Sequence, residues 1–373
     1  MLLTALVFFL ILTILIFVHE LGHFTVARAI GVAVEEFGFG LPPRIWGKKI
    51  GGTVYSVNAL PIGGFVKLAG EDEDEELHGQ KRLNLAKQGL TFKKYFWARS
   101  KKERSAILIA GVAMNFLVAV GITSYLLTQG VHEPSGRVHI ERVIVGSPAE
   151  QAGLKAKDVI TAVDITKITL DVRPAQPIRV PQDLIGFVKV HAGERIVLTV
   201  VRDEKPLMVA LVPRKDYPRG EGPMGVAISD LERKTYSFSE APVAAVRINL
   251  VRGKEMLVSI GRMLWRLITL QPVGSEVAGP IGIARVTGEA VKFGWKAVLE
   301  FMSILSLNLA VLNILPIPAL DGGRLAFVFL EKLLGRRLKP AFEKSTHQIG
   351  MIVLLLLILL ISLNDIMRLA RGG

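Results

Sequence analysis

The segment that decides the fold is residues 2–23, which read LLTALVFFLILTILIFVHELGH. Residues 2–18 are apolar apart from two threonines, and they run directly into the pentapeptide HELGH at residues 19–23. A helix needs about 20 apolar residues to cross the hydrocarbon core of a bilayer. No basic residues precede the segment and no small-residue cleavage site follows it. We therefore expect a retained membrane helix over residues 2–27 and not a signal peptide.

Three further apolar stretches predict three more membrane helices, at about residues 105–128, 297–320 and 346–366. Lys and Arg are dense between the first two spans, in residues 31–104, and again in the link between the third and fourth spans. Four spans place both basic segments on one side of the membrane, and the positive-inside rule makes that side cytoplasmic. We expect a multi-pass protein of the plasma membrane with both termini, and the region between the second and third spans, outside the cytoplasm.

The composition agrees with this interpretation. Apolar residues make up 50% of the 373 residues and charged residues only 21%. The 46 basic against 33 acidic residues give a net charge of +13, which we interpret as a topology signal and not as a nucleic-acid surface, since no nucleic-acid-binding motif accompanies it. Cysteine is absent, which excludes disulfides, thiolate zinc sites and cysteine nucleophiles.

The region between the second and third spans divides into two parts. Residues 130–230 alternate short β-rich runs with turns and have the size of one small domain. The stretch SPAEQAGLKAKDVI at residues 147–160 resembles a PDZ domain, which implies binding of extended peptides or C-termini at a sheet edge. A β-rich spacer without a ligand is the alternative. Residues 231–295 are expected to hold a linker and an amphipathic helix, 252–269, that lies at the membrane interface or packs on the β-rich domain.

The chemistry is predicted to lie in His19, Glu20 and His23. Residues four apart on a helix share a face, so both imidazoles can reach one ion, and Glu20 beside them can act as a general base on water. Two histidines and a glutamate at the end of an apolar helix are costly in lipid, which favours a functional role over an interfacial cap. The pattern predicts one zinc ion per chain.

A catalytic zinc ion takes three protein ligands and leaves one position open, so a third ligand must come from elsewhere. Other histidines and two carboxylates that follow the motif are candidates: His78, His132, His139, His191, His347, Glu35 and Glu36. Asp321 is the better candidate, because it closes the third apolar stretch. It lies within NLAVLNILPIPALDGG at residues 308–323, whose prolines would break a membrane helix beside a polar cavity. The alternative is that Asp321 belongs to a helix C-cap with Gly322 and Gly323.

Taken together, these motifs resemble the site-2 protease family of intramembrane zinc metalloproteases. HELGH at residues 19–23 and NILPIPALDGG at residues 313–323 carry the resemblance. The β-rich domain makes the chain most similar to the RseP-like bacterial regulators of sigma-factor activation, with one PDZ-like unit where some relatives have two. Residues 55–70 resemble the family's membrane-reentrant β-hairpin, and residues 279–283 a motif ahead of the third span. Residues 111–115 resemble the second-span motif, with valine where proline is usual.

The resemblance implies an α-helical polytopic membrane protein of about four spans, with an inserted PDZ-like domain and a membrane-associated β-hairpin. It implies zinc on His19, His23 and Asp321, with Glu20 as the base and no other cofactor. Five residues are expected to contact substrate, namely Asn313, Asn308, Gly63, Gly64 and Asn115. The implied substrates are membrane segments of single-span proteins, such as anti-sigma factors and remnant signal peptides, including those that a site-1 protease has already cut.

Two other functions remain open at this point. A catalytically silent membrane scaffold could use the β-rich domain to collect partners. A membrane-anchored metalloprotease could act on soluble peptides.

Overall fold

The structure is a computed structural model, and it describes residues 2–71, 94–165, 175–218, 220–269, 279–336, 338 and 340–370. The chain forms two compact units, Met1–Thr128 with Ser237–Gly373, and Gln129–Tyr236. The first unit contains four helices that are long and apolar enough to cross a membrane, and the second is rich in β-strands. The expected combination of a polytopic helical part and a β-rich part is therefore confirmed.

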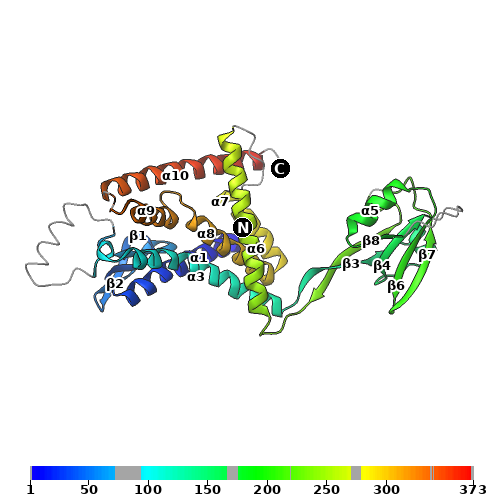
Figure 1. The fold of residues 1–373 in the computed structure, drawn as a ribbon, viewed down its shortest axis with the longest axis horizontal. Coiled ribbons are helices and arrows are strands. Elements are labelled where there is room, and N and C mark those ends of the chain that lie inside the picture. The colour runs from blue at the N-terminus through cyan, green and yellow to red at the C-terminus, as the bar shows by residue number, and fades with distance from the viewer. Residues whose placement is uncertain are drawn as a thin grey trace, which may run out of the picture. The chain divides into compact units, whose positions relative to one another are not determined.

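The four apolar helices lie close to the predicted spans (Figure 1). They are α1 (Leu2–Ile30), α3 (Lys101–Thr128), α8 (Trp295–Ile314) and α10 (Pro340–Ala370). α3 contacts α1 and α8 along their lengths. α8 ends at Ile314, earlier than the predicted residue 320, because the two prolines that follow cannot continue a helix.

A fifth long helix, α6 (Ala241–Ile268), packs on α3 and α8 within the helical unit. Its Met256 and Ile260 lie against an apolar cluster formed by those two helices. Asn249 donates a hydrogen bond to Thr123 Oγ1 at 3.1 Å, so a buried polar link joins α6 to α3. The amphipathic helix thus begins earlier than predicted, and its neighbours are membrane helices. The predicted linker also contains a further helix, α7 (Pro280–Phe293).

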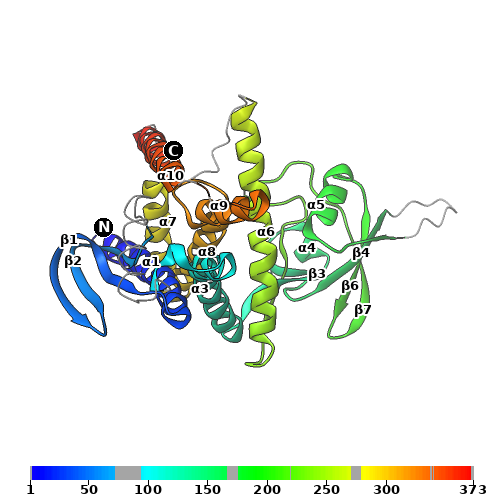
Figure 2. The ribbon, with the colours of Figure 1, turned by 60° about the vertical axis from the view of Figure 1, so that its left-hand side comes forward.

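β1 (Val34–Ile50) and β2 (Thr53–Leu68) form a sheet beside α1 (Figure 2). Both strands bend at prolines, so the sheet is more than a simple hairpin. Residues 36–39 pair with residues 64–67 on one side and with residues 54–57 on the other. Within the described part of the chain no strand pairs with the far side of residues 64–67, so this segment is an open sheet edge.

The C-terminal part of the helical unit is tied together at two places. α9 (Asp321–Leu334) follows α8 through a short loop, and the His347 side chain of α10 accepts a hydrogen bond from the loop's Ala319 N–H at 2.9 Å. Near its other end, α10 presents buried Asp365 to the start of α7, where the carboxylate accepts bonds from Gly279 N–H and Gly282 N–H, each at 3.0 Å. A carboxylate at a helix N-terminus satisfies otherwise unpaired donors. The start of α7 therefore anchors α10, and Gly279 allows the two helices to approach, because a Cβ atom there would meet Ile361 and Asp365.

The β-rich unit contains an antiparallel sheet in the order β7-β6-β4-β3-β8, with β5 beside β4. Its elements are β3 (Val131–Val143), α4 (Pro148–Gln151), β4 (Val159–Ile165), β5 (Gln176–Pro177), α5 (Pro181–Val190), β6 (Ile196–Arg202), β7 (Lys205–Leu211) and β8 (Val226–Lys234). Alternate strand residues and Leu184 and Val188 of α5 form one apolar core. Ser147 caps the short helix α4 by accepting a bond from Glu150 N–H. β8 lies at the sheet edge, in contact with α5.

Candidate metal centre

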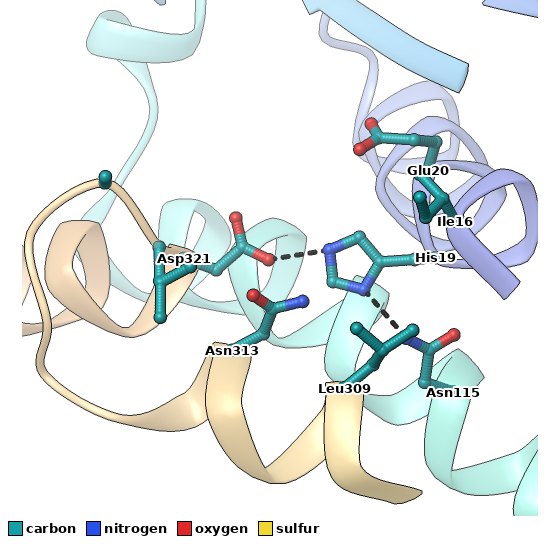
Figure 3. A pocket seen from close by; sticks show the side chains of 9 residues that line it. Ile16, His19, Glu20, Asn115, Leu309, Asn313 and Asp321 are labelled. Atoms are coloured by element: carbon teal, nitrogen blue, oxygen red, sulfur yellow. Dashed lines mark hydrogen bonds and ion pairs between the residues drawn. The ribbon is translucent and has the colours of Figure 1, made fainter. Parts of the chain in front are cut away.

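Three potential metal donors converge at one point between α1 and α9. His19 Nε2 lies 2.9 Å from Asp321 Oδ2, and His23 Nε2 lies 3.2 Å from the same oxygen. The two Nε2 atoms are 3.1 Å apart. Both imidazoles are buried and the carboxylate is partly buried. The pair spaced four residues apart on α1 thus meets a carboxylate from the distant C-terminal region. Figure 3 shows His19 and Asp321 of this cluster.

One stripe of α3 supports both imidazole rings. His23 Nδ1 lies 2.8 Å from the carbonyl oxygen of Ile107, and His19 Nδ1 lies 3.4 Å from the Asn115 side-chain amide. Gly111, midway between them, lies directly against both rings, and a Cβ atom there would collide with each. Residues 107, 111 and 115 recur every four positions and therefore share a face of the helix.

The loop between α8 and α9 presents Asp321 without leaving backbone donors unpaired. Pro316 and Pro318 have no N–H group. The remaining N–H groups are all satisfied: residues 315, 317 and 320 by local carbonyl oxygens, and residue 319 by His347. These hydrogen bonds stabilise the loop, because unpaired backbone groups are costly away from water. Asp321 is the first residue of α9, so the alternative of a helix C-cap is wrong.

The glycines after Asp321 allow α9 to press against this loop. A Cβ atom at Gly322 would meet the backbone of residues 314–315, and one at Gly323 would meet the backbone of residues 317–318. Gly350 of α10 packs equally closely on Pro318 from the other side. The loop is therefore held between two helices, which fixes the carboxylate in place.

A buried ion pair locks α9 onto α3. Arg104 of α3 and Glu331 of α9 are in direct contact, with side chains only 9% and 6% exposed. Lys101 Nζ donates a second bond to the Glu331 carbonyl oxygen at 2.8 Å. α3 therefore positions all three donors: the two imidazoles directly, and Asp321 through α9.

Glu20 lines the same cavity as His19 and Asp321 and also reaches the sheet (Figure 3). Its Oε2 accepts a hydrogen bond of 3.0 Å from the backbone N–H of Val66, on the open edge of β2. A second link between α1 and the sheet lies about two turns earlier on α1, where Thr13 Oγ1 donates a hydrogen bond to Pro61 O at 3.0 Å. α1 and the sheet are thus joined on both sides of Gly63 and Gly64.

A cavity of about 220 Å³ opens onto this cluster. Its polar lining residues are His19, Glu20, Asn115, Asn313 and Asp321, and the remainder of the lining is mostly apolar. Asn313, near the end of α8, directs its amide towards the space between Asp321 and His19 (Figure 3). The cavity is large enough for water and a short piece of extended chain.

The other sequence candidates lie elsewhere. Asn308 does not line the cavity, although it lies on α8. Glu35 and Glu36 form surface ion pairs with Lys67 and Arg44. His347 contacts the loop and not the metal donors, and His78 lies outside the described residues. Three histidines belong to the β-rich unit, namely His132, His139 and His191.

The donor set fits zinc. In a tetrahedral site with bonds of about 2.0–2.2 Å, neighbouring ligand atoms are about 3.3–3.6 Å apart. The three donor atoms here are 2.9–3.2 Å apart, and the cavity adjoins them where a fourth ligand would enter. Two imidazoles and a carboxylate with an open position are typical of catalytic zinc.

Comparison with known proteins agrees with the geometry. Residues 7–357 match peptidase family M50. A relative from Fusobacterium nucleatum is 32% identical over 98% of this chain and 99% of its own. The regulator of sigma-W protease RasP of Bacillus subtilis and the zinc metalloprotease RasP of Bacillus licheniformis are each 28% identical, again over 98% of this chain and 99% of theirs.

The fold and the site define a membrane-embedded metallopeptidase. The chain belongs to peptidase family M50, the site-2 proteases, and is a metalloprotease of that family. The resemblance seen in the sequence is confirmed.

Proposed function

We propose that this protein is an intramembrane zinc endopeptidase that cleaves the membrane segments of single-span proteins. His19, His23 and Asp321 hold one zinc ion, and Glu20 is the general base. The observation that carries the proposal is that His19, Glu20 and Asp321 line one cavity beside helices long and apolar enough to span a membrane, while His23 contacts the same oxygen of Asp321.

The chain's own residues supply most of the mechanism. When bound, zinc acts as a Lewis acid and makes water nucleophilic at neutral pH. Glu20 takes a proton from the attacking water and passes it to the leaving amine. Asn313 faces the same space and donates a hydrogen bond to a substrate carbonyl group.

The open edge of β2 is suited to holding an extended substrate. A membrane helix must unwind before it is cut, and its freed backbone groups find no water in lipid. The edge near Gly63 and Gly64 offers main-chain pairing directly beside Glu20. Asn308 remains a proposed contact farther along α8.

The charge distribution supports a site near the cytoplasmic side, with the β-rich unit and both termini outside the cytoplasm. We assign the β-rich unit as a PDZ-like domain, because β8 is an edge strand in contact with α5 and can accept a peptide C-terminus as an added strand. Such a unit would favour substrates already cut by a site-1 protease. The relationship to RasP supports anti-sigma factors as substrates, alongside remnant signal peptides.

The test measures zinc and cleavage together. Wild type, Glu20→Gln, Asp321→Asn and a control, Glu289→Gln, are purified in detergent; Glu289 is an exposed residue of α7. Each is assayed for bound zinc and for cleavage of a fusion with one membrane helix and of soluble casein. We expect one zinc ion per chain in all but Asp321→Asn. Only wild type and the control should cut the fusion, and Glu20→Gln should be at least about 100-fold slower.

Each alternative has its own signature. A zinc-free, inactive wild type would establish the scaffold. Efficient cleavage of casein would establish a protease for soluble peptides. Full zinc retention by Asp321→Asn would show that the third ligand is a different residue.

A further inference from the structure

We propose that Asn115 is a positioning residue that fixes the His19 ring, and that it does not contact substrate. The inference rests on the proposed zinc site, and it reassigns a residue that the sequence placed among the substrate contacts. The observation behind it is what Nδ1 of each imidazole contacts, since Nδ1 faces away from Asp321.

Both rings use Nε2 towards Asp321, so both Nδ1 atoms must be accommodated by the protein. His23 Nδ1 faces the Ile107 carbonyl oxygen at 2.8 Å, which can only accept a hydrogen bond. The corresponding neighbour of His19 Nδ1 is the Asn115 amide at 3.4 Å. Figure 3 shows Asp321 and Asn115 on opposite sides of the His19 ring. Such outer partners orient metal-binding imidazoles and determine which nitrogen carries the proton.

The chemistry of a neutral imidazole decides which end of the amide must face it. Metal binding through Nε2 leaves the proton on Nδ1, so the neighbour has to accept. In the structure Asn115 turns Nδ2 to the ring, while its Oδ1 is buried with no hydrogen-bond partner among the described residues. The two orientations of an amide are nearly equal in shape. A half-turn of the amide therefore brings the unpartnered oxygen onto Nδ1–H.

The surroundings of Asn115 favour positioning over substrate contact. Although Asn115 lines the cavity, it is 0% exposed, and its own carbonyl oxygen accepts a bond of 2.8 Å from Ser306 Oγ on α8. It is thus fixed between α1 and α8. Asn313 differs, since it is only partly buried and faces the open cavity, where a substrate can reach it.

The experiment compares an isosteric apolar variant with a variant that retains an acceptor. Asn115→Leu removes the acceptor, and Asn115→Asp keeps it. Asn249→Leu is the matched control, because Asn249 is another buried asparagine of the same helix bundle and contacts Thr123 instead of a histidine. Zinc affinity of the full-length protein in detergent is measured by competition with a chelator, and the cobalt form is examined by visible absorption.

We expect Asn115→Leu to bind zinc about 10- to 100-fold more weakly, with an altered cobalt spectrum. Asn115→Asp should remain within a few-fold of wild type, and Asn249→Leu should equal wild type. If Asn115→Leu fails to fold, Asn115→Ala is measured in its place.

Two results would overturn the inference while leaving the proposed function intact. In the first, Asn115→Leu keeps wild-type zinc affinity and cobalt spectrum but has a raised KM, which would restore the substrate contact. In the second, Asn249→Leu weakens zinc as much as Asn115→Leu does, which would make the effect a general loss of packing. A wild type that binds no zinc would instead reject the proposed function, and this inference with it.

Discussion

Glu20 and Val66 join the metal-site helix to the sheet edge through one hydrogen bond of 3.0 Å between the carboxylate and a backbone N–H. The donor belongs to the main chain, so no side-chain substitution at Val66 removes it except proline. Proline is tolerated on an edge strand where the N–H points away from the sheet.

Val66→Pro should therefore retain zinc but cleave more slowly. A hydrogen bond to a charged group contributes about 1.5–3 kcal/mol, so we expect kcat to fall by about 10- to 100-fold. Val66→Ala keeps the N–H and is the control. Wild-type kcat in Val66→Pro would show that Glu20 is oriented by other groups.

Gly111→Ala should destroy the metal site. The added Cβ would overlap both imidazole rings, which cannot both move away and still meet Asp321. Gly121→Ala is the matched control on the same helix, because a Cβ there meets nothing within 4 Å. We expect zinc to be lost in the first variant and kept in the second, with the control equally or more stable to heat by up to about 1 kcal/mol. Zinc content of the two purified proteins measures the difference.

The Arg104–Glu331 pair should respond differently to single and double substitution. Arg104→Met leaves a buried, unpaired carboxylate and should lower the free energy of unfolding by about 3–5 kcal/mol. Arg104→Met combined with Glu331→Leu should recover most of that loss, because the double variant buries no charge. Thermal unfolding in detergent tests both. A double variant as unstable as the single one would mean that the pair is needed for more than charge balance.

The β-rich unit contains a pair that should make its stability depend on pH. Burial acts to raise the pKa of Asp158, but hydrogen bonds from the Arg202 side chain and the Lys155 backbone N–H outweigh it, and the pKa lies below its usual value. A lowered pKa stabilises the fold above the unfolded-state pKa. The stabilisation is lost as the pH falls through the folded-state pKa.

Arg202→Met should therefore begin to lose protection of β4 and β6 at a higher pH than wild type does. Hydrogen exchange of the full-length protein, followed by mass spectrometry across an acid series, measures this. Identical pH profiles for the two proteins would assign the stability of the sheet to its apolar core alone.

Much of this arrangement follows from the sequence, because its signals are local. Apolar length predicts the four spans, and the spacing of His19 and His23 predicts a shared helix face. Asp321 could be singled out because prolines and glycines flank it in an apolar segment.

The supporting contacts could not be predicted, because they arise from the backbone or from pairing across the fold. The contacts of the Ile107 carbonyl oxygen and the Val66 N–H are made by backbone groups. Nearly every residue has these groups, so the sequence does not indicate which of them will be used. The folding back of β1 and β2 depends on register. α7 is not predicted, because one proline and two glycines within its 14 residues favour a linker over a helix.

The long separation of His23 from Asp321, 298 residues along the chain, has a consequence for biosynthesis. At a synthesis rate of about 5–20 residues per second, the first two donors precede the third by about 15–60 seconds. During that interval the nascent chain carries a helix with two histidines and a glutamate but no complete ligand set. The proposed set of three metal donors is therefore complete only after residue 321 has been synthesised and α9, which it begins, has packed against α3.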